Sequence, residues 1–150
     1  MFVDSSVILN VMFETQLTEL ARKVIESNEP KITSDTVIDE VYLVVLKKVL
    51  LPESRSTRGL KRLLKKDVKA REKAGELLAL VLGSIHAMGI VVVGDAKWDA
   101  VGELVSEYGL LPHDARILAT AIEYGCERLA TLDEDFKVVE DLVELVPGKP

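Results

Sequence analysis

The sequence predicts one α/β domain in three layers, with a mostly parallel central sheet between two layers of helices. Short apolar runs alternate with longer segments whose apolar residues recur every three or four positions, as in proteins where strands alternate with helices. The run at 89–94 is apolar and has glycine at both ends, which is typical of a parallel strand covered on both faces. A chain of 150 residues can bury a complete core in one domain.

In the first half of the chain, cap and turn residues separate the expected elements. A strand at 2–3 stops at Asp4, which together with the two serines after it can cap a turn or a helix. Pro30 ends a helical pattern, and a short strand at 31–33 follows it. Helices are expected where the apolar period is near 3.6, namely at 17–25, at 37–49 and in a longer amphipathic pattern from 60 to 81.

The second half continues this alternation. After the strand at 89–94, a helix is expected at 98–108, and Pro112 suits the start of the next one. Gly125 is placed just beyond the end of that helix. The buried face of that helix is expected to hold Ile117, Leu118, Ala121 and Ile122. Two strands follow in the prediction, at 128–131 and, as an edge strand, within 142–146, before a frayed tail at 147–150.

The composition excludes several classes of protein. A single cysteine, Cys126, allows neither an internal disulfide nor a cysteine zinc site. The N-terminus lacks the basic and apolar regions of a signal peptide, and the longest apolar runs are too short to cross a membrane. We therefore expect a cytoplasmic protein with no membrane partner. The scarcity of Asn and Gln beside abundant Lys and Glu resembles the composition of thermophile proteins.

The formal charge of -6 is unevenly distributed along the chain. Residues 47–73 hold 11 basic and 3 acidic side chains, a net charge of +8, which leaves -14 for the other residues. This part overlaps a basic helical segment at about 51–83, which is either a solvated surface or an anion-binding face. A nucleic acid bound there would be attracted through its phosphates without its sequence being read, so binding would weaken with salt. The candidate residues for such binding are Arg58, Lys61, Arg62 and Lys65, with Arg55, Lys66 and Lys69 beside them.

Four acidic residues are expected near the carboxyl ends of the strands, where ligands bind in open α/β sheets. Asp4 follows the first strand, Asp133 follows the strand at 128–131, Asp114 begins a helix, and Glu40 lies in the first turns of another. Singly, each is explained as a helix or turn cap. Together, they would repel one another unless a divalent cation neutralises them. Oxygen ligands without a His or Cys cluster indicate Mg²⁺ or Mn²⁺ in place of zinc.

Other polar and aromatic residues leave two interpretations open. Ser6 and Thr131 either hydrogen-bond a ligand carboxylate or cap turns. His113 either orients Asp114 or moves a proton, or it has only a surface or loop role, and this last interpretation is favoured. The spacing of Trp98 and Tyr108 favours core or dimer packing on a buried helix face over base stacking. Cys126 is expected to be a small buried filler.

Four acidic blocks together resemble the motifs of the PIN domain family, most closely those of VapC-type toxin ribonucleases. They occur in the family's order and span Asp4 to Phe136, with the last two the most specific. The blocks are Asp4 to Leu9, Glu40 in the helix after 31–33, Leu111 to Ala121, and Thr131 to Phe136.

The resemblance implies a metal-dependent endoribonuclease, often a dimeric toxin that a partner antitoxin inhibits. Carried over by position, the catalytic acids are Asp4, Glu40, Asp114 and Asp133, of which Asp4, Asp114 and Asp133 would bind one or two Mg²⁺ or Mn²⁺ ions. The cation would activate a water and neutralise charge on the scissile phosphate, with no covalent enzyme intermediate. The expected partners are an RNA substrate, an antitoxin protein and a second copy of the chain.

Two features depart from the small-toxin pattern. The fourth block offers both Asp133 and Asp135, of which Asp133 is favoured as the direct ligand and Asp135 as a residue that caps or orients it. The basic segment is long for such a toxin, so two alternatives remain. One is an RNA-processing PIN nuclease outside a toxin–antitoxin pair, and the other is a non-catalytic PIN-fold module that binds RNA or protein.

Overall fold

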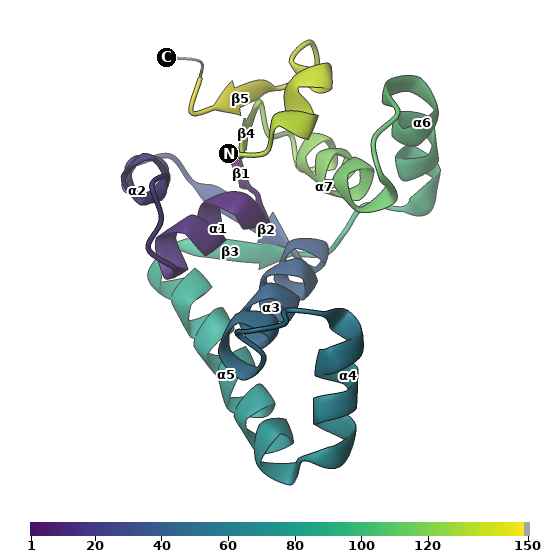
Figure 1. Ribbon diagram of the computed structural model, residues 1–150. Coiled ribbons are helices and arrows are strands. Elements are labelled where there is room, and N and C mark those ends of the chain that lie inside the picture. Colours follow the sequence, from purple (N-terminus) through teal and green to yellow (C-terminus); the bar gives the residue numbers. More distant parts are fainter. Residues whose placement is uncertain (149–150) are drawn as a thin grey trace.

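The computed structural model describes residues 1–148 and has a five-stranded sheet at its centre (Figure 1). The strands are β1 (Phe2–Val3), β2 (Lys31–Ser34), β3 (Ile90–Val93), β4 (Arg128–Ala130) and β5 (Glu144–Val146). All pairs are parallel, and the order across the sheet is β3-β2-β1-β4-β5. The strand order therefore reverses between β1 and β4, where open α/β sheets bind ligands.

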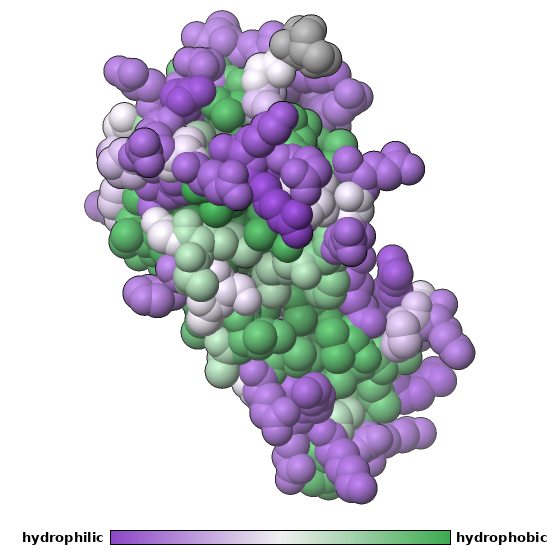
Figure 2. Space-filling model, turned by 90° about the vertical axis from the view of Figure 1, so that its left-hand side faces the viewer, coloured by the Kyte–Doolittle hydropathy of each residue, from purple (hydrophilic) through white to green (hydrophobic). Residues whose placement is uncertain are grey.

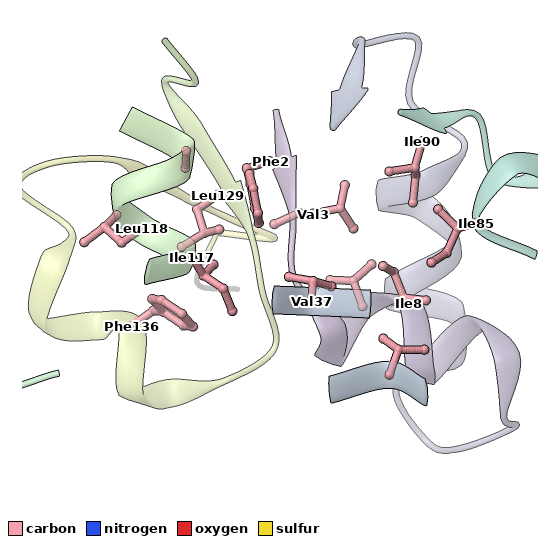
Figure 3. Packing of buried hydrophobic residues seen from close by; sticks show 14 of the residues in the cluster. Phe2, Val3, Ile8, Val37, Ile85, Ile90, Ile117, Leu118, Leu129 and Phe136 are labelled. Atoms are coloured by element: carbon pink, nitrogen blue, oxygen red, sulfur yellow. The ribbon is translucent and has the colours of Figure 1, made fainter. Parts of the chain in front are cut away.

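Helices flank the sheet on both faces, which confirms the three-layer α/β/α prediction. The helices are α1 (Ser5–Met12), α2 (Thr18–Ile25), α3 (Asp35–Leu50), α4 (Thr57–Lys66), α5 (Val68–Ala87), α6 (Trp98–Tyr108), α7 (Pro112–Glu123) and the 3₁₀ helix η1 (Glu134–Val139). In Figure 3, Ile117, Leu118 and Phe136 lie on one side of β1, while Ile8, Val37 and Ile85 lie on the other. Both layers thus bury apolar side chains against the central strands.

Caps explain several of the element boundaries. The sequence allowed either a turn or a helix after β1, and the structure has a helix there. The side chain of Asp4 caps this helix by accepting a hydrogen bond from the main-chain N–H of Ser6. Asp67 caps α5 by accepting from the N–H of Ala70, and this cap divides the amphipathic pattern from 60 to 81 into α4 and α5. Gly109 ends α6 in the left-handed conformation, with φ 68°.

The prediction that the strand at 89–94 is covered on both faces is wrong. Among the described residues, β3 is an edge strand that pairs only with β2, and Val91 and Val92 are 61% and 40% exposed. Apolar composition alone does not distinguish an edge strand from a central one, because the distinction depends on which strands pair.

Other predictions of burial also differ from the structure. Trp98 is 62% exposed, which contradicts packing in the core of the chain and leaves the alternative of dimer packing untested. Ile122 lies outside the buried face of α7. Cys126 is only half-buried. The predicted tail at 147–150 lies in part outside the described residues. Within residues 1–148, every helix is too short or too polar to cross a bilayer.

Candidate active site

Asp4 lies at the reversal point of the sheet, between the end of β1 and the start of α1. The residue is buried, and its carboxylate accepts hydrogen bonds from three side-chain hydroxyls. Ser6 Oγ donates to Oδ2 at 2.8 Å, Thr131 Oγ1 donates to Oδ2 at 2.9 Å, and Ser5 Oγ donates to Oδ1 at 3.4 Å. These bonds fix the orientation of a carboxylate that has little water around it.

Ser6 and Thr131 also join β1 to the loop after β4. Ser6 Oγ accepts from the N–H of Leu132 at 2.9 Å, and Thr131 Oγ1 accepts from the N–H of Asp133 at 3.0 Å. Both hydroxyls therefore contact the Asp4 carboxylate and hold the segment that carries Asp133. Ser6 and Thr131 therefore do both things that the sequence suggested: each hydrogen-bonds a carboxylate, and each holds a turn.

Asp114 is placed by the start of α7, where Pro112 occupies the first helical position. It is only 6% exposed, and Oδ1 lies 3.2 Å from His113 Nε2. The pKa of Asp114 is raised to about 6, mainly by burial; the nearby His113 opposes the rise, and the negative charges of Asp133, Asp4 and Glu40 add to it. The charges of the other three acids therefore act on Asp114.

Glu40 lies in the second turn of α3 and is half-buried. Burial raises the pKa of Glu40, a hydrogen bond with Ser5 opposes that rise, and the charge of Asp4 adds to it. A raised pKa suits a carboxylate that accepts and returns a proton near neutral pH.

Asp133 is the most exposed of the four acids. It caps η1, and its Oδ1 accepts from the main-chain N–H of Asp135 at 2.9 Å. Asp135 thus contacts Asp133 through its backbone, and the residue itself is exposed.

The donor chemistry of this cluster fits a hard divalent cation. Asp4, Asp114 and Asp133 offer carboxylate oxygens, and the mutual repulsion that raises the pKa of Asp114 is the kind that a cation relieves. In the described part of the chain, no three His, Cys, Asp or Glu side chains already form a ready-made metal site.

The candidate RNA-binding residues lie elsewhere, on α4. Arg58, Lys61, Arg62 and Lys65 are all exposed, and the opposite side of α4 buries Leu60 against the body of the protein. The strongly amphipathic sequence of α4 explains this orientation. These four cations lie on α4, whereas the acids lie on other elements, at the end of β1, on α3, at the start of α7 and just before η1.

The sequence alone did not single out Ser5, Asp95 and Arg116 as residues of the site. The side chain of His113 is 49% exposed, in agreement with the favoured surface role, and it also pairs with Asp114. Arg116 Nη2 lies 3.7 Å from Asp95 Oδ2. Arg116 comes two positions after Asp114 at the start of a predicted helix, and this closeness in sequence could have indicated that Arg116 lies near the site.

Comparison with known proteins adds independent evidence. The family model described as PIN domain matches residues 1–142. The sequence is 25% identical to that of Ribonuclease VapC6 of Methanocaldococcus jannaschii, in an alignment that covers 97% of this chain and 95% of the relative. The crystal structure of Mycobacterium tuberculosis VapC20, titled a sarcin-ricin loop cleaving toxin, has 14% identity, a TM-score of 0.60, and coverage of 92% of this chain and 93% of that one. Since the family model spans nearly the whole chain, this protein belongs to the PIN domain family.

Proposed function

We propose that the protein is an endoribonuclease that requires Mg²⁺ or Mn²⁺ and acts as the toxin of a toxin–antitoxin pair. The observation that carries the proposal is the convergence of Asp4, Glu40, Asp114 and Asp133 at the reversal point of the sheet, where Asp114 is buried with a raised pKa. Similarity to a protein named Ribonuclease VapC6 over almost the entire chain supports the same reaction class. Buried carboxylates that repel one another destabilise the fold, so a protein with only a structural role would gain nothing from them. An enzyme can use such carboxylates to bind a cation or to transfer a proton.

In this proposal, Asp4, Asp114 and Asp133 hold the cation. When bound, the cation supplies Lewis-acid activation of water and neutralisation of charge on the phosphate. Glu40 accepts the proton that the attacking water loses, because its raised pKa keeps its affinity for a proton high. Ser6 and Thr131 keep the Asp4 carboxylate oriented.

The exposed cations of α4 attract the RNA backbone. Arg58, Lys61, Arg62 and Lys65 project from one helix away from its buried face and supply charge without base recognition. Backbone phosphates therefore bind toward α4, while the reacting phosphate lies at the acids.

An antitoxin and a second copy of the chain are the proposed protein partners. Leu80 and Leu82 of α5 and Val91 and Val92 of β3 are exposed apolar side chains. Figure 2 shows hydrophobic residues gathered on the face that includes α5, between hydrophilic areas above and below. A contiguous exposed apolar surface is typical of a protein interface.

The test is an RNA cleavage assay with the purified protein. We expect cleavage of mixed RNAs in Mn²⁺ or Mg²⁺ and none in excess EDTA, with activity restored when the cation is added back. Expression should also arrest the growth of host cells. Cleavage that persists unchanged in EDTA would contradict the metal mechanism, and no cleavage of any RNA would favour a non-catalytic binding module. Cleavage without growth arrest would favour an RNA-processing nuclease.

Replacing Thr131 with valine is expected to lower cleavage by about 10- to 100-fold, the usual cost of removing a group that orients a metal ligand. The hydroxyl donates to Asp4 and accepts from the N–H of Asp133, so Thr131→Val releases both acids at once. The measurement is the cleavage rate as a function of Mn²⁺ concentration. The variant should need more Mn²⁺, and Thr131→Ser, which keeps the hydroxyl, should recover most of the rate. Equal rates for the valine variant and the wild type at every concentration would exclude this positioning role.

A further inference from the structure

A pocket that includes several charged residues in its lining adjoins the acidic cluster and has no role in the proposed chemistry. It has a volume of about 520 Å³ and lies between the starts of α3, α6 and α7. Its walls include Asp35, Asp39, Asp95, Trp98, His113 and Arg116. His113 connects the two sites, because it lines this pocket and pairs with Asp114 at 3.2 Å. A molecule in the pocket would therefore be a neighbour of the group bound at the acids.

Trp98 gives the pocket an exposed aromatic wall. The residue is 62% exposed, and one face of its ring is covered by the Arg116 guanidinium, whose Cζ lies 4.6 Å from the ring centroid. Since most of the residue is exposed despite this contact, the ring keeps a surface on which a planar group can stack. Nucleic acid bases that leave their own stack bind to such aromatic faces.

Arg116 already supplies the positive charge of the pocket. Its guanidinium lies against Trp98 and 3.7 Å from Asp95, and Asp95 also accepts a hydrogen bond from the N–H of Thr36 at 3.2 Å. The Asp95 carboxylate thus has both a cation and an N–H donor. A basic side chain from a partner protein would have to compete with Arg116 for this position, which favours a neutral, planar ligand.

The exposed wall of the pocket accepts hydrogen bonds. Asp35 and Asp39 are four residues apart on α3, so both lie on the same face of the helix, and both are exposed. Ionised carboxylates only accept hydrogen bonds, and their charge repels phosphates. Guanine presents adjacent N–H and NH₂ donors on its Watson–Crick edge, which match the two oxygens of one carboxylate. Uracil presents a single N–H between two carbonyl oxygens, which a carboxylate repels.

We propose that this pocket is a nucleobase subsite that selects guanine next to the cleaved phosphate. The base stacks on the open face of Trp98, and Asp39 accepts from its Watson–Crick edge, while the sugar–phosphate backbone stays outside. This proposal rests on the proposed function for its biological substrate, since the adjoining acids act on RNA only if the protein is a ribonuclease. The binding of the base itself requires no cleavage.

Trp98 is the only tryptophan in the chain, so its fluorescence reports on this pocket alone. The experiment titrates the full-length protein with pentauridylate and with the same oligomer carrying one central guanosine, in EDTA and at low salt. We expect the guanosine oligomer to quench the fluorescence saturably. It should bind at least about tenfold more tightly than pentauridylate, because loss of one bidentate contact to a base weakens binding by about this factor. Asp39→Asn should remove this preference while quenching remains. The matched control is Asp99→Asn, which removes the same charge from an exposed residue beside Trp98 that does not line the pocket.

Three results would overturn the proposal. They are the absence of saturable quenching by any oligomer, equal affinity for the two oligomers, and the same loss of preference in Asp39→Asn and Asp99→Asn. Quenching by an arginine amide without quenching by the guanosine oligomer would also overturn it and assign the pocket to a basic protein segment. If the protein binds guanosine selectively but never cleaves RNA with any cation, the ribonuclease proposal fails and the subsite stands.

Trp98→Ala and Trp98→Phe extend the test to cleavage. Loss of one base stack is expected to raise KM by roughly 5- to 100-fold for RNA with guanine at the cleavage site. The kcat should change little, and phenylalanine should recover part of the affinity because it keeps an aromatic face. A fall in kcat with unchanged KM would contradict a binding role for this residue.

Discussion

Replacing Asp114 with asparagine is expected to lower the rate of Mn²⁺-dependent RNA cleavage by at least about a hundredfold. Loss of a residue that orients a metal ligand usually lowers activity by about 10- to 100-fold, and loss of the ligand itself should lower it more. Asp114 is buried in the first turn of α7, where its carboxylate interacts with the other three acids. Asparagine keeps the shape of the side chain but removes its charge. The measurement is the single-turnover cleavage rate in saturating Mn²⁺.

The same substitution should stabilise the folded protein at pH 7. The pKa of Asp114 is raised to about 6 in the folded state, so the folded protein binds its proton more tightly than the unfolded chain does. The contribution of this group to the free energy of unfolding therefore falls as pH rises from about 4 to about 6. After allowance for solvent screening, we expect Asp114→Asn to be more stable than the wild type by about 1 to 2 kcal/mol above that window. Urea unfolding at pH 5 and pH 7 measures the difference.

Two comparisons separate a functional Asp114 from a merely structural one. Mn²⁺ should raise the melting temperature of the wild type and raise that of Asp114→Asn much less, because binding to the folded state stabilises it. Asp99→Asn removes an exposed carboxylate outside the cluster and should leave the cleavage rate unchanged. The proposal would be contradicted if Asp114→Asn were less stable than the wild type at pH 7 and Mn²⁺ raised the melting temperatures of both proteins equally. Asp114 would then belong to no shared cation site.

The positions of the acids followed from local sequence signals. Asp4 and Asp133 come directly after short apolar runs, and Pro112 marks the start of the helix that carries Asp114, so each acid could be assigned to the end of a strand or the start of a helix. Parallel pairing then requires these ends to meet at one edge of the sheet. The order β3-β2-β1-β4-β5 places β1 and β4 side by side and so brings Asp4 and Asp133 together.

Properties that depend on tertiary neighbours could not be predicted in this way. Val91 and Val92 belong to a run that is as apolar as a central strand, but β3 lies at the edge of the sheet formed by residues 1–148, and both are exposed. Trp98 has the spacing of a buried helix residue, yet it contacts Arg116 on the next helix and lines a pocket. A helical period identifies one face of a helix, whereas the partner of that face depends on the packing of other elements.

Replacing Phe136 with alanine is expected to lower the free energy of unfolding by about 3 to 5 kcal/mol, the usual cost of removing a buried phenyl ring. Phe136 is 1% exposed and lies beside Ile117 and Leu118 of α7 in the close view of the core (Figure 3). The ring anchors η1, whose capping residue is Asp133, so the packing of one apolar side chain holds an acid of the site in place.

Val138 provides the matched control, because it belongs to the same 3₁₀ helix but is 54% exposed. Val138→Ala should change the stability by no more than about 0.5 kcal/mol, as expected for a surface substitution. Phe136→Leu, which refills part of the cavity, should fall between the two alanine variants. Urea unfolding of all three measures the series. If Phe136→Ala costs no more than Val138→Ala, then η1 is held by its cap at Asp133 and not by its packing on α7, and the cleavage rate should then survive the loss of the ring.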